Sequence, residues 1–164
     1  MSPSLIIVLA CILAVVGLVT MFLPRVPAVL AGYLALVSAH FAGAVFVSSQ
    51  VLWFWGVATA LVLGLRVLQP RALVDASQGH WFTAAGTIAG AFAGFAISAT
   101  QAAVILGGAA GAFVGTAAFS RTATGSVLRQ RQGAFVQYLC AKGIPALVCA
   151  SMSVMTLAIA SAVL

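Results

Sequence analysis

The sequence GTIAGAFAGFAISATQAAVILGGAAGAFVG, residues 86–115, has glycine at every fourth position in two runs. The first run is Gly86, Gly90 and Gly94, and the second is Gly107, Gly111 and Gly115. Residues four apart share a helix face, so each run predicts a face without side chains that another backbone can approach closely. The polar residues at 98–101 between the runs predict a turn. The stretch is therefore expected to form a glycine-zipper hairpin of two antiparallel helices.

The sequence leaves open what fills the two glycine faces. The two runs could pack on each other within the chain, one run could face a second subunit, or the faces could line a pore. Helix association in lipid gains little from the hydrophobic effect, so close van der Waals contact matters in each case. The pattern indicates close helix packing, and it does not indicate an activity.

The rest of the 164-residue chain is also strongly apolar. Hydrophobic residues make up 64% of it and charged residues 5%, with a mean hydropathy of +1.24. Soluble domains carry roughly 25% charged residues, and disordered chains are polar and rich in charge. Too few charges are present to cover a water-facing surface. The composition predicts an all-α integral membrane protein with a single transmembrane domain, residues 1–164.

Charged residues divide the chain into stretches of one or two spanning lengths. A helix that crosses the hydrocarbon core needs about 20 residues. The first and last stretches, 1–24 and 143–164, each hold one helix of this length. The two middle stretches, 26–65 and 78–120, are about twice as long as one span, so each must fold back as a hairpin. We expect a bundle of about six transmembrane helices, at residues 4–23, 27–42, 49–68, 82–98, 103–120 and 136–162.

With six spans, all the arginines fall in loops on one side of the membrane. These loops follow the first, third and fifth helices, and their arginines are Arg25, Arg66, Arg71, Arg121, Arg129 and Arg131. The positive-inside rule makes this side cytoplasmic and places both termini outside. Segment 121–132 either only sets this topology or also binds anionic lipid headgroups or a protein on the cytoplasmic leaflet.

The basic residue that stands out is Lys142, which is followed closely by Pro145. A proline has no N–H to donate to the carbonyl four residues earlier. The carbonyl freed in this way and the Lys142 ammonium are candidates for a polar site within the membrane. The alternative is that the last helix begins near residue 143, so that Lys142 extends to the cytoplasmic headgroups.

The other polar residues do not suggest catalysis, a metal or a cofactor. The chain has no Glu and one Asp, Asp75, which is expected to pair with Arg71 or cap a helix. His40 and His80 are isolated, and Cys11, Cys140 and Cys149 lie in apolar segments without metal-binding spacing. The bases are too scattered for a nucleic-acid groove. We therefore expect a protein that is not an enzyme and binds no cofactor, metal or nucleic acid.

Three segments together resemble a bacterial integral-membrane family, catalogued as domain of unknown function four-five-six. They are LPRVP at 23–27, GTIAGAFAG at 86–94 and LGGAAGAFVG at 106–115. The chain departs from that family at Gly108, where the family usually has Pro, and at Thr116, where it usually has an acid. The resemblance implies a multi-pass protein of the bacterial cytoplasmic (inner) membrane, and it implies no activity.

Two functions fit these features. One is a small transporter or permeation protein, expected to be a homo-oligomer, with Lys142, Pro145 and the glycine-lined groove at its site. The other is a structural or accessory subunit that docks in a larger membrane complex through its glycine faces. Membrane lipid is the expected partner in both cases.

Overall fold

The computed structural model describes residues 3–23, 27–42, 47–68, 79–130 and 133–163. Every regular element in this part of the chain is a helix, which confirms the all-α class. Five of the six long helices begin and end within a few residues of the expected spans, and the sixth expected span, 136–162, is covered by α8 (Ala134–Tyr138), η2 (Leu139–Gly143) and α9 together. The six long helices are α1 (Pro3–Thr20), α2 (Ala28–Phe41), α3 (Ser49–Leu68), α5 (His80–Ile97), α6 (Gln101–Ser120) and α9 (Ile144–Val163).

Three helices in the described residues are long and apolar enough to cross a membrane, fewer than the six predicted. They are Ser49–Val67, Gln101–Ser120 and Ala134–Ser161. Two others, Leu5–Thr20 and Ala28–Phe41, are apolar but shorter. The helix α2 has 14 residues, short of the roughly 20 that a perpendicular span needs. The helix α5 has 18 residues and starts with His80 and Trp81, which lower its hydropathy.

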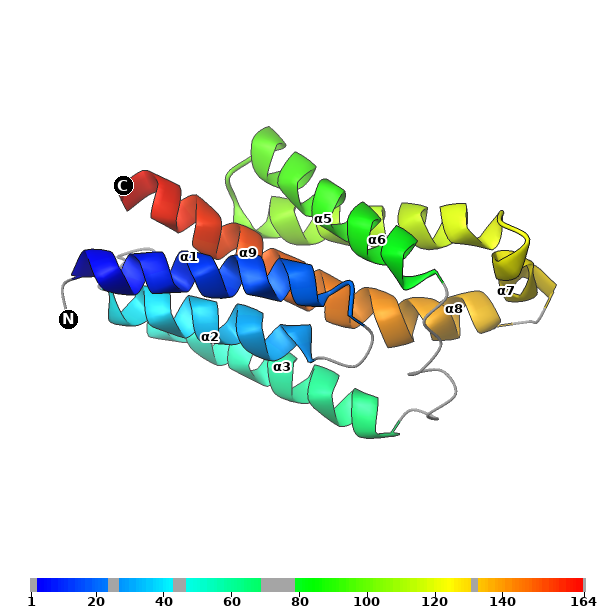
Figure 1. The fold of residues 1–164 in the computed structure, drawn as a ribbon, viewed down its shortest axis with the longest axis horizontal. Helices are drawn as coiled ribbons and strands as arrows, with labels where there is room; N and C mark the ends of the chain where they lie inside the picture. The colour runs from blue at the N-terminus through cyan, green and yellow to red at the C-terminus, as the bar shows by residue number, and fades with distance from the viewer. Residues whose placement is uncertain (1–2, 24–26, 43–46, 69–78, 131–132, 164) are drawn as a thin grey trace.

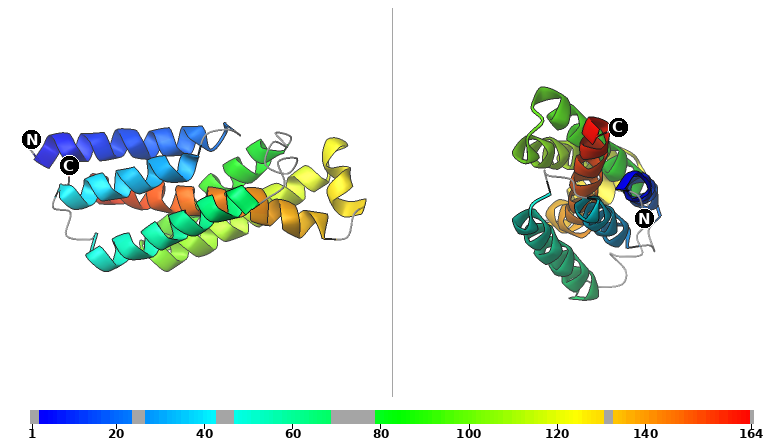
Figure 2. Two further views of the ribbon diagram at one scale, coloured as in Figure 1. Left: turned by 90° about the horizontal axis from the view of Figure 1, so that it is seen from below. Right: turned by 90° about the vertical axis from the view of Figure 1, so that its left-hand side faces the viewer.

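Helix α9 lies at the centre of the bundle, as the view along the long axis shows (Figure 2). Its residues Cys149 and Met152 belong to one buried cluster, which they form with α1, α2 and α3. Ala150 and Val154, on another side of α9, belong to a second cluster with α5 and α6. Because successive helical residues point in different directions, one central helix joins the two groups.

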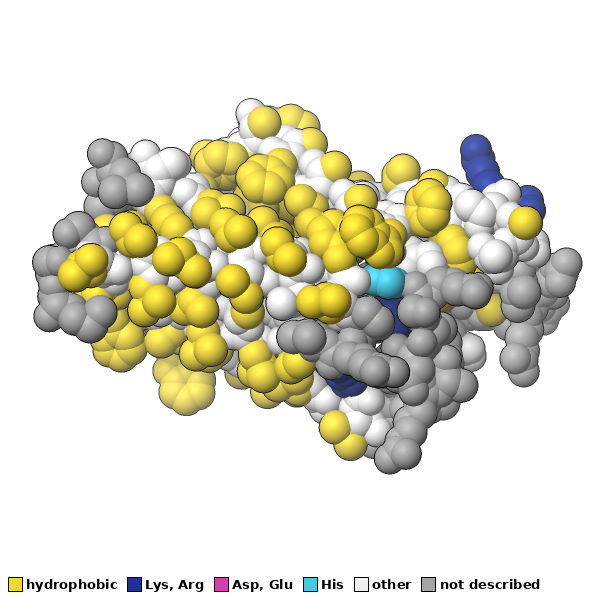
Figure 3. All heavy atoms as spheres, viewed as in Figure 1, with side chains coloured by type: hydrophobic (Ala, Val, Ile, Leu, Met, Phe, Trp, Pro, Cys, Tyr) yellow, Lys and Arg dark blue, Asp and Glu magenta, His cyan; other side chains and the backbone are white. Residues whose placement is uncertain are grey.

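The helix ends are sorted between the two ends of the bundle (Figure 1). Both chain termini lie at one end, and α1, α3 and α6 finish at the other. The basic side chains visible in the space-filling view lie toward this second end (Figure 3). Large apolar side chains cover much of the flank between the ends in this view (Figure 3). The exposed large apolar residues of the molecule include Leu61, 63% exposed, and Leu106, 70% exposed. Such an apolar exterior is typical of a surface that faces lipid.

Local signals explain where the α5–α6 hairpin starts and turns. Gly79 precedes α5 with φ of 83°, a left-handed conformation that glycine adopts without steric cost. Thr100 caps α6, because its side-chain oxygen accepts a hydrogen bond from the backbone N–H of Ala103 at 3.3 Å. The turn therefore falls within the polar segment from which it was predicted.

Candidate functional site

The last helical segment contains one widened turn, which includes Lys142. The elements α8 (Ala134–Tyr138), η2 (Leu139–Gly143) and α9 follow each other without a break, and η2 is a π-helix. The N–H of Ile144 donates to the carbonyl of Leu139, five residues earlier. The next residue, Pro145, has no N–H, so this part of the helix has one backbone donor fewer than it has carbonyl acceptors. Single π turns of this kind are frequent at functional sites.

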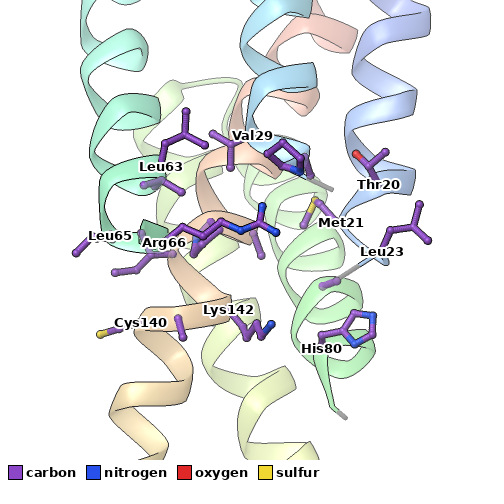
Figure 4. Close-up of a pocket in the computed structure, with 18 residues that line it drawn as sticks. Thr20, Met21, Leu23, Val29, Leu63, Leu65, Arg66, His80, Cys140 and Lys142 are labelled. Carbon is purple, nitrogen blue, oxygen red and sulfur yellow. The ribbon is translucent and has the colours of Figure 1, made fainter. Parts of the chain in front are cut away.

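A pocket of about 100 Å³ lies beside this π turn (Figure 4). Its walls come from the end of α1, the start of α2, the end of α3, the start of α5 and the π turn. The lining residues are Thr20, Met21, Leu23, Pro27, Ala28, Val29, Val62, Leu63, Leu65, Arg66, His80, Ala84, Cys140, Ala141, Lys142, Ile144, Pro145 and Ala146. Most of them are apolar, so the few polar groups lie in largely apolar surroundings.

Two basic side chains extend into this space from different helices. Arg66 reaches from the last turn of α3 toward the middle of the pocket, and Lys142 extends from the π turn toward the side on which His80 lies (Figure 4). The sulfur of Cys140 points away from both of them. The pocket thus brings a guanidinium and an ammonium, 76 positions apart in the sequence (142 − 66), to one cavity.

His80 holds the start of α5 against the end of α1. Its Nε2 lies 2.6 Å from the backbone carbonyl of Phe22. A carbonyl oxygen only accepts, so Nε2 is the donor and carries a proton. The next residue, Trp81, packs against the Phe22 ring at a tilt of 40°, with the ring centroids 4.5 Å apart. These two contacts fix one wall of the pocket.

The six zipper glycines lie together in the interface between α5 and α6. A methyl group placed on Gly90 would lie 2.9 Å from Cα of Gly111, and one on Gly107 would lie 2.9 Å from Cα of Gly94. Side chains cannot fit at such distances, so the two backbones are in direct contact. Of the alternatives left open by the sequence, packing within the chain is the one that the structure contains.

A pair of buried hydroxyls lies on the inner side of the same hairpin. The hydroxyls of Thr83 and Thr116 are 3.0 Å apart, and both residues are almost fully buried. The hydroxyl of Thr116 also donates to the Ala112 carbonyl at 2.8 Å. These bonds satisfy polar groups that would otherwise be costly to bury.

A second close contact, between α1, α2 and α9, lies next to the pocket. A methyl group added to Gly17 would be 3.0 Å from Oγ of Ser153 and 3.2 Å from the backbone nitrogen of Gly32. The fully buried thiol of Cys149 donates to the Ala28 carbonyl at 3.2 Å. Of the three cysteines in apolar segments, Cys149 is buried, Cys11 is half-buried and Cys140 is exposed.

The structure separates the predicted basic residues into two groups. Lys142, Pro145 and Arg66 line one pocket, although Arg66 was assigned only to topology. Arg121 follows α6 and is exposed, and Arg129 lies in the short helix α7 (Val127–Gln130), both outside the pocket. The predictions made for Arg25, Arg71, Arg131 and Asp75 concern positions outside the described residues.

The structure places Lys142 in the π turn of a helical segment that is continuous from Ala134 to Ser161, within which α9 itself begins at Ile144. Both alternatives for Lys142, a polar site within the membrane and an extension to the cytoplasmic headgroups, stay predictions. Segment 121–132, treated as one polar loop, contains the short helices η1 (Thr124–Ser126) and α7.

Sequence reasoning missed three residues that shape the pocket or its surroundings. His80 was taken as an isolated residue at a hairpin end, and Gly17 and Gly32 were not considered because neither belongs to a run of glycines. A weak signal was present, since the helices α1 and α2 each carry one glycine, at 17 and at 32, among larger residues.

The chain matches no protein-family model, no curated protein and no solved structure. The resemblance to the domain of unknown function four-five-six therefore stays a prediction. Among the residues that the structure describes, no group of three or more His, Cys, Asp or Glu side chains lies close enough to hold a metal ion.

Proposed function

We propose that this protein is a small transporter or permeation protein of the bacterial cytoplasmic membrane, with the Arg66–Lys142 pocket as its solute site. The six long helices would be its six spans, with the shorter ones crossing at positions where the bilayer is thinned or neighbouring segments extend the helix. Support for a membrane location comes from the three helices of spanning length and the apolar flank.

The orientation that we propose follows the distribution of charge. The described basic residues Arg66, Arg121, Arg129 and Lys142 lie in the last turn of α3, after α6, in α7 and in η2, all toward the end opposite the termini. The positive-inside rule assigns this end to the cytoplasm and the end with the termini to the outside.

The observation that carries the proposal is the placement of a lysine and an arginine in one pocket beside a π turn within a helix. Charged side chains within membrane helices are costly, and they commonly mark solute pathways. Single π turns inside helices are also frequent at functional sites. Here Lys142, Pro145 and the π turn combine both features on one wall of the pocket.

The arrangement of the glycines also favours a self-contained protein. The six zipper glycines contact each other across α5 and α6, so most of their surface is used within the chain. An accessory subunit that docked through these glycine faces could contact only the part of their surface that the packing of α5 on α6 leaves exposed.

A second candidate function, an accessory or oligomer-forming subunit, is favoured by one observation. An open apolar groove runs along the outer side of the α5–α6 hairpin, lined by the edges of the glycines and by residues such as Ala89, Ala93, Leu106 and Ala110. Another helix, from a partner or a second copy, is a suitable occupant of such a groove in lipid.

Reconstitution of the purified protein into liposomes tests the proposed function. We expect flux of at least one small anion among chloride, acetate and inorganic phosphate, and we expect Lys142→Met to lower that flux at least tenfold at equal protein content. The matched control is Arg121→Met, an exposed basic residue at the same end but outside the pocket.

Two results would count against a transport site at Lys142. One is a wild-type protein that transports none of the anions and purifies with a stoichiometric membrane partner, which would favour the accessory function. The other is flux that is equal in wild type and Lys142→Met.

A further inference from the structure

We propose that the pocket between α3, α5 and the π turn binds a phosphate group, with Arg66 and Lys142 as its two ligands. The inference rests on the same pocket as the proposed function and deepens it by naming the chemical class of the bound molecule. The phosphate belongs either to a phospholipid headgroup or to a soluble phosphate compound, and the experiment below distinguishes the two.

The charge of the pocket selects an anion. The chain contains one acidic residue, Asp75, and two basic side chains line this cavity. A single carboxylate can offset only one of these two positive charges, so the side chains of this chain leave the cavity with a net positive charge. The apolar walls have a low dielectric constant and concentrate the field of the remaining charge within the cavity.

The chemistry of the two basic groups suits phosphate better than a halide or a single carboxylate. A guanidinium presents a planar fork of N–H donors that matches two oxygens of a phosphate, and an ammonium adds three donors as a compact charge. Arg66 and Lys142 come from two different helices and extend into the same space (Figure 4). A tetrahedral anion can accept hydrogen bonds from two such directions at once.

The size of the pocket limits what it can hold. Its volume is about 100 Å³. Sites for drug-sized ligands measure roughly 300–1,000 Å³. The pocket therefore fits one phosphate group, with the remainder of the molecule outside, where apolar residues such as Leu23 and Leu65 are exposed.

The depth of the pocket matches the level of lipid phosphates. The continuous helix Ala134–Ser161 has 28 residues, which at about 1.5 Å per residue is about 42 Å long. The hydrocarbon core is about 30 Å thick, so about 12 Å, or about eight residues, extend beyond it. If Ser161 lies at one boundary of the core, the other boundary falls close to Lys142. The ends of α1 and α3 and the starts of α2 and α5 surround the same pocket, as expected at a boundary.

Two binding measurements on the full-length protein test this inference. In the lipid arm, the protein is extracted from liposomes of phosphatidylcholine containing one tenth phosphatidylglycerol, washed in detergent at high salt, and examined by native mass spectrometry for retained lipid. In the soluble arm, the lipid-free protein in detergent is titrated with inorganic phosphate against chloride at constant ionic strength, with thermal stability as readout.

We expect one arm to show saturable binding, and we expect Arg66→Met and Lys142→Met each to weaken it at least tenfold. Arg121→Met is the matched control, and it should weaken binding no more than about fivefold, the effect of one surface cation near anionic headgroups. Size-exclusion elution identical to wild type shows that each variant is folded. Retained phosphatidylglycerol assigns the phosphate to a lipid, and stabilisation by inorganic phosphate assigns it to a soluble compound.

The inference is overturned if neither probe binds, or if the folded Arg66→Met and Lys142→Met variants bind like wild type. It is also overturned if Arg121→Met loses as much binding as they do. The outcomes for the proposed function are separate. Binding without flux of any anion contradicts the proposed transport and supports the phosphate site. Flux of chloride or acetate without phosphate binding supports transport and contradicts the phosphate site.

Discussion

The α5–α6 hairpin and the α1–α2–α9 region are built from similar apolar residues, yet they pack in different ways. In the hairpin, glycines place backbone against backbone, and a methyl group on Gly90 would meet atoms of the Gly107 and Gly111 main chain. Around α9, a methyl group on Gly17 would first meet the Ser153 hydroxyl, which is a side-chain atom. Close helix contact in this protein therefore has two forms. Contact of backbone with backbone, as in the hairpin, leaves no room for an added side chain. Contact of backbone with a side chain, as at Gly17, can adjust when that side chain moves.

The largest effect is expected from bulky residues in the hairpin. Gly90→Leu or Gly111→Leu would force the backbones of α5 and α6 apart, because main-chain atoms occupy the space around both positions. We expect a loss of about 3 kcal/mol or more in the free energy of unfolding. Unfolding by sodium dodecyl sulfate in mixed micelles measures it.

A matched control for the hairpin variants is Gly64→Leu. An added Cβ at Gly64, a helical glycine of α3, meets no other atom within 4 Å. We expect its stability to change by less than about 0.5 kcal/mol. If Gly90→Leu and Gly64→Leu were equally stable, the backbone contact between α5 and α6 would not be real.

A smaller effect is expected in the α1–α2–α9 region. Gly17→Ala should cost about 1 kcal/mol, because the new methyl group presses on Oγ of Ser153 and on the backbone of Gly32. In the double variant Gly17→Ala/Ser153→Ala the Oγ is absent, so part of this loss should be recovered. Thermal unfolding of the two single variants and the double variant measures the coupling. Strictly additive losses would show that Ser153 does not limit the space at Gly17.

The buried hydroxyl pair adds a polar term to the packing of the hairpin. Thr116→Val keeps the shape of the side chain and removes its hydrogen bond to Thr83. We expect a cost of about 0.6 kcal/mol and at most about 1.7 kcal/mol, the range found for hydrogen bonds between membrane helices. A double-mutant cycle with Thr83→Val isolates the pairwise energy, and a coupling near zero would contradict a bond between the two hydroxyls.

The smallest effect on stability is expected from Cys11→Ala and Cys140→Ala, since neither thiol is fully buried. Each should change stability by less than about 0.5 kcal/mol, which gives a background for labelling single introduced cysteines. In this background, Ala99→Cys at the α5–α6 turn and Thr124→Cys after α6 lie at opposite ends of the bundle. A membrane-impermeant maleimide added to intact cells should label only Ala99→Cys. Labelling of both positions from outside would contradict the proposed topology.

The sequence predicted the hairpin better than the pocket, and the reason is physical. Helix ends follow from charges, prolines and polar turn residues, which are local, so five of the six long helices were placed within a few residues. The glycine pairing follows from a repeat of four within two neighbouring helices. The pocket depends on Arg66, His80 and Lys142, which lie on helices whose relative positions no local pattern specifies.

The π turn illustrates the same limit at a single position. Pro145 indicated that a backbone donor was missing, but a helix can respond by ending, by bending or by widening one turn. Here it widens over Leu139–Gly143. The helix continues because its residues pack on α1, α2, α5 and α6 at the same time, and these contacts form only in the assembled bundle.

The central position of α9 also has a consequence for the order in which the protein is made and assembled. The α5–α6 hairpin can form as soon as both of its helices have left the ribosome, because the residues that contact each other are close in sequence. The walls of the cavity come from five parts of the chain, and the π turn is the last of them to be synthesised. A nascent chain stopped before residue 134 would therefore contain a finished hairpin and two exposed groups of helices, and no cavity.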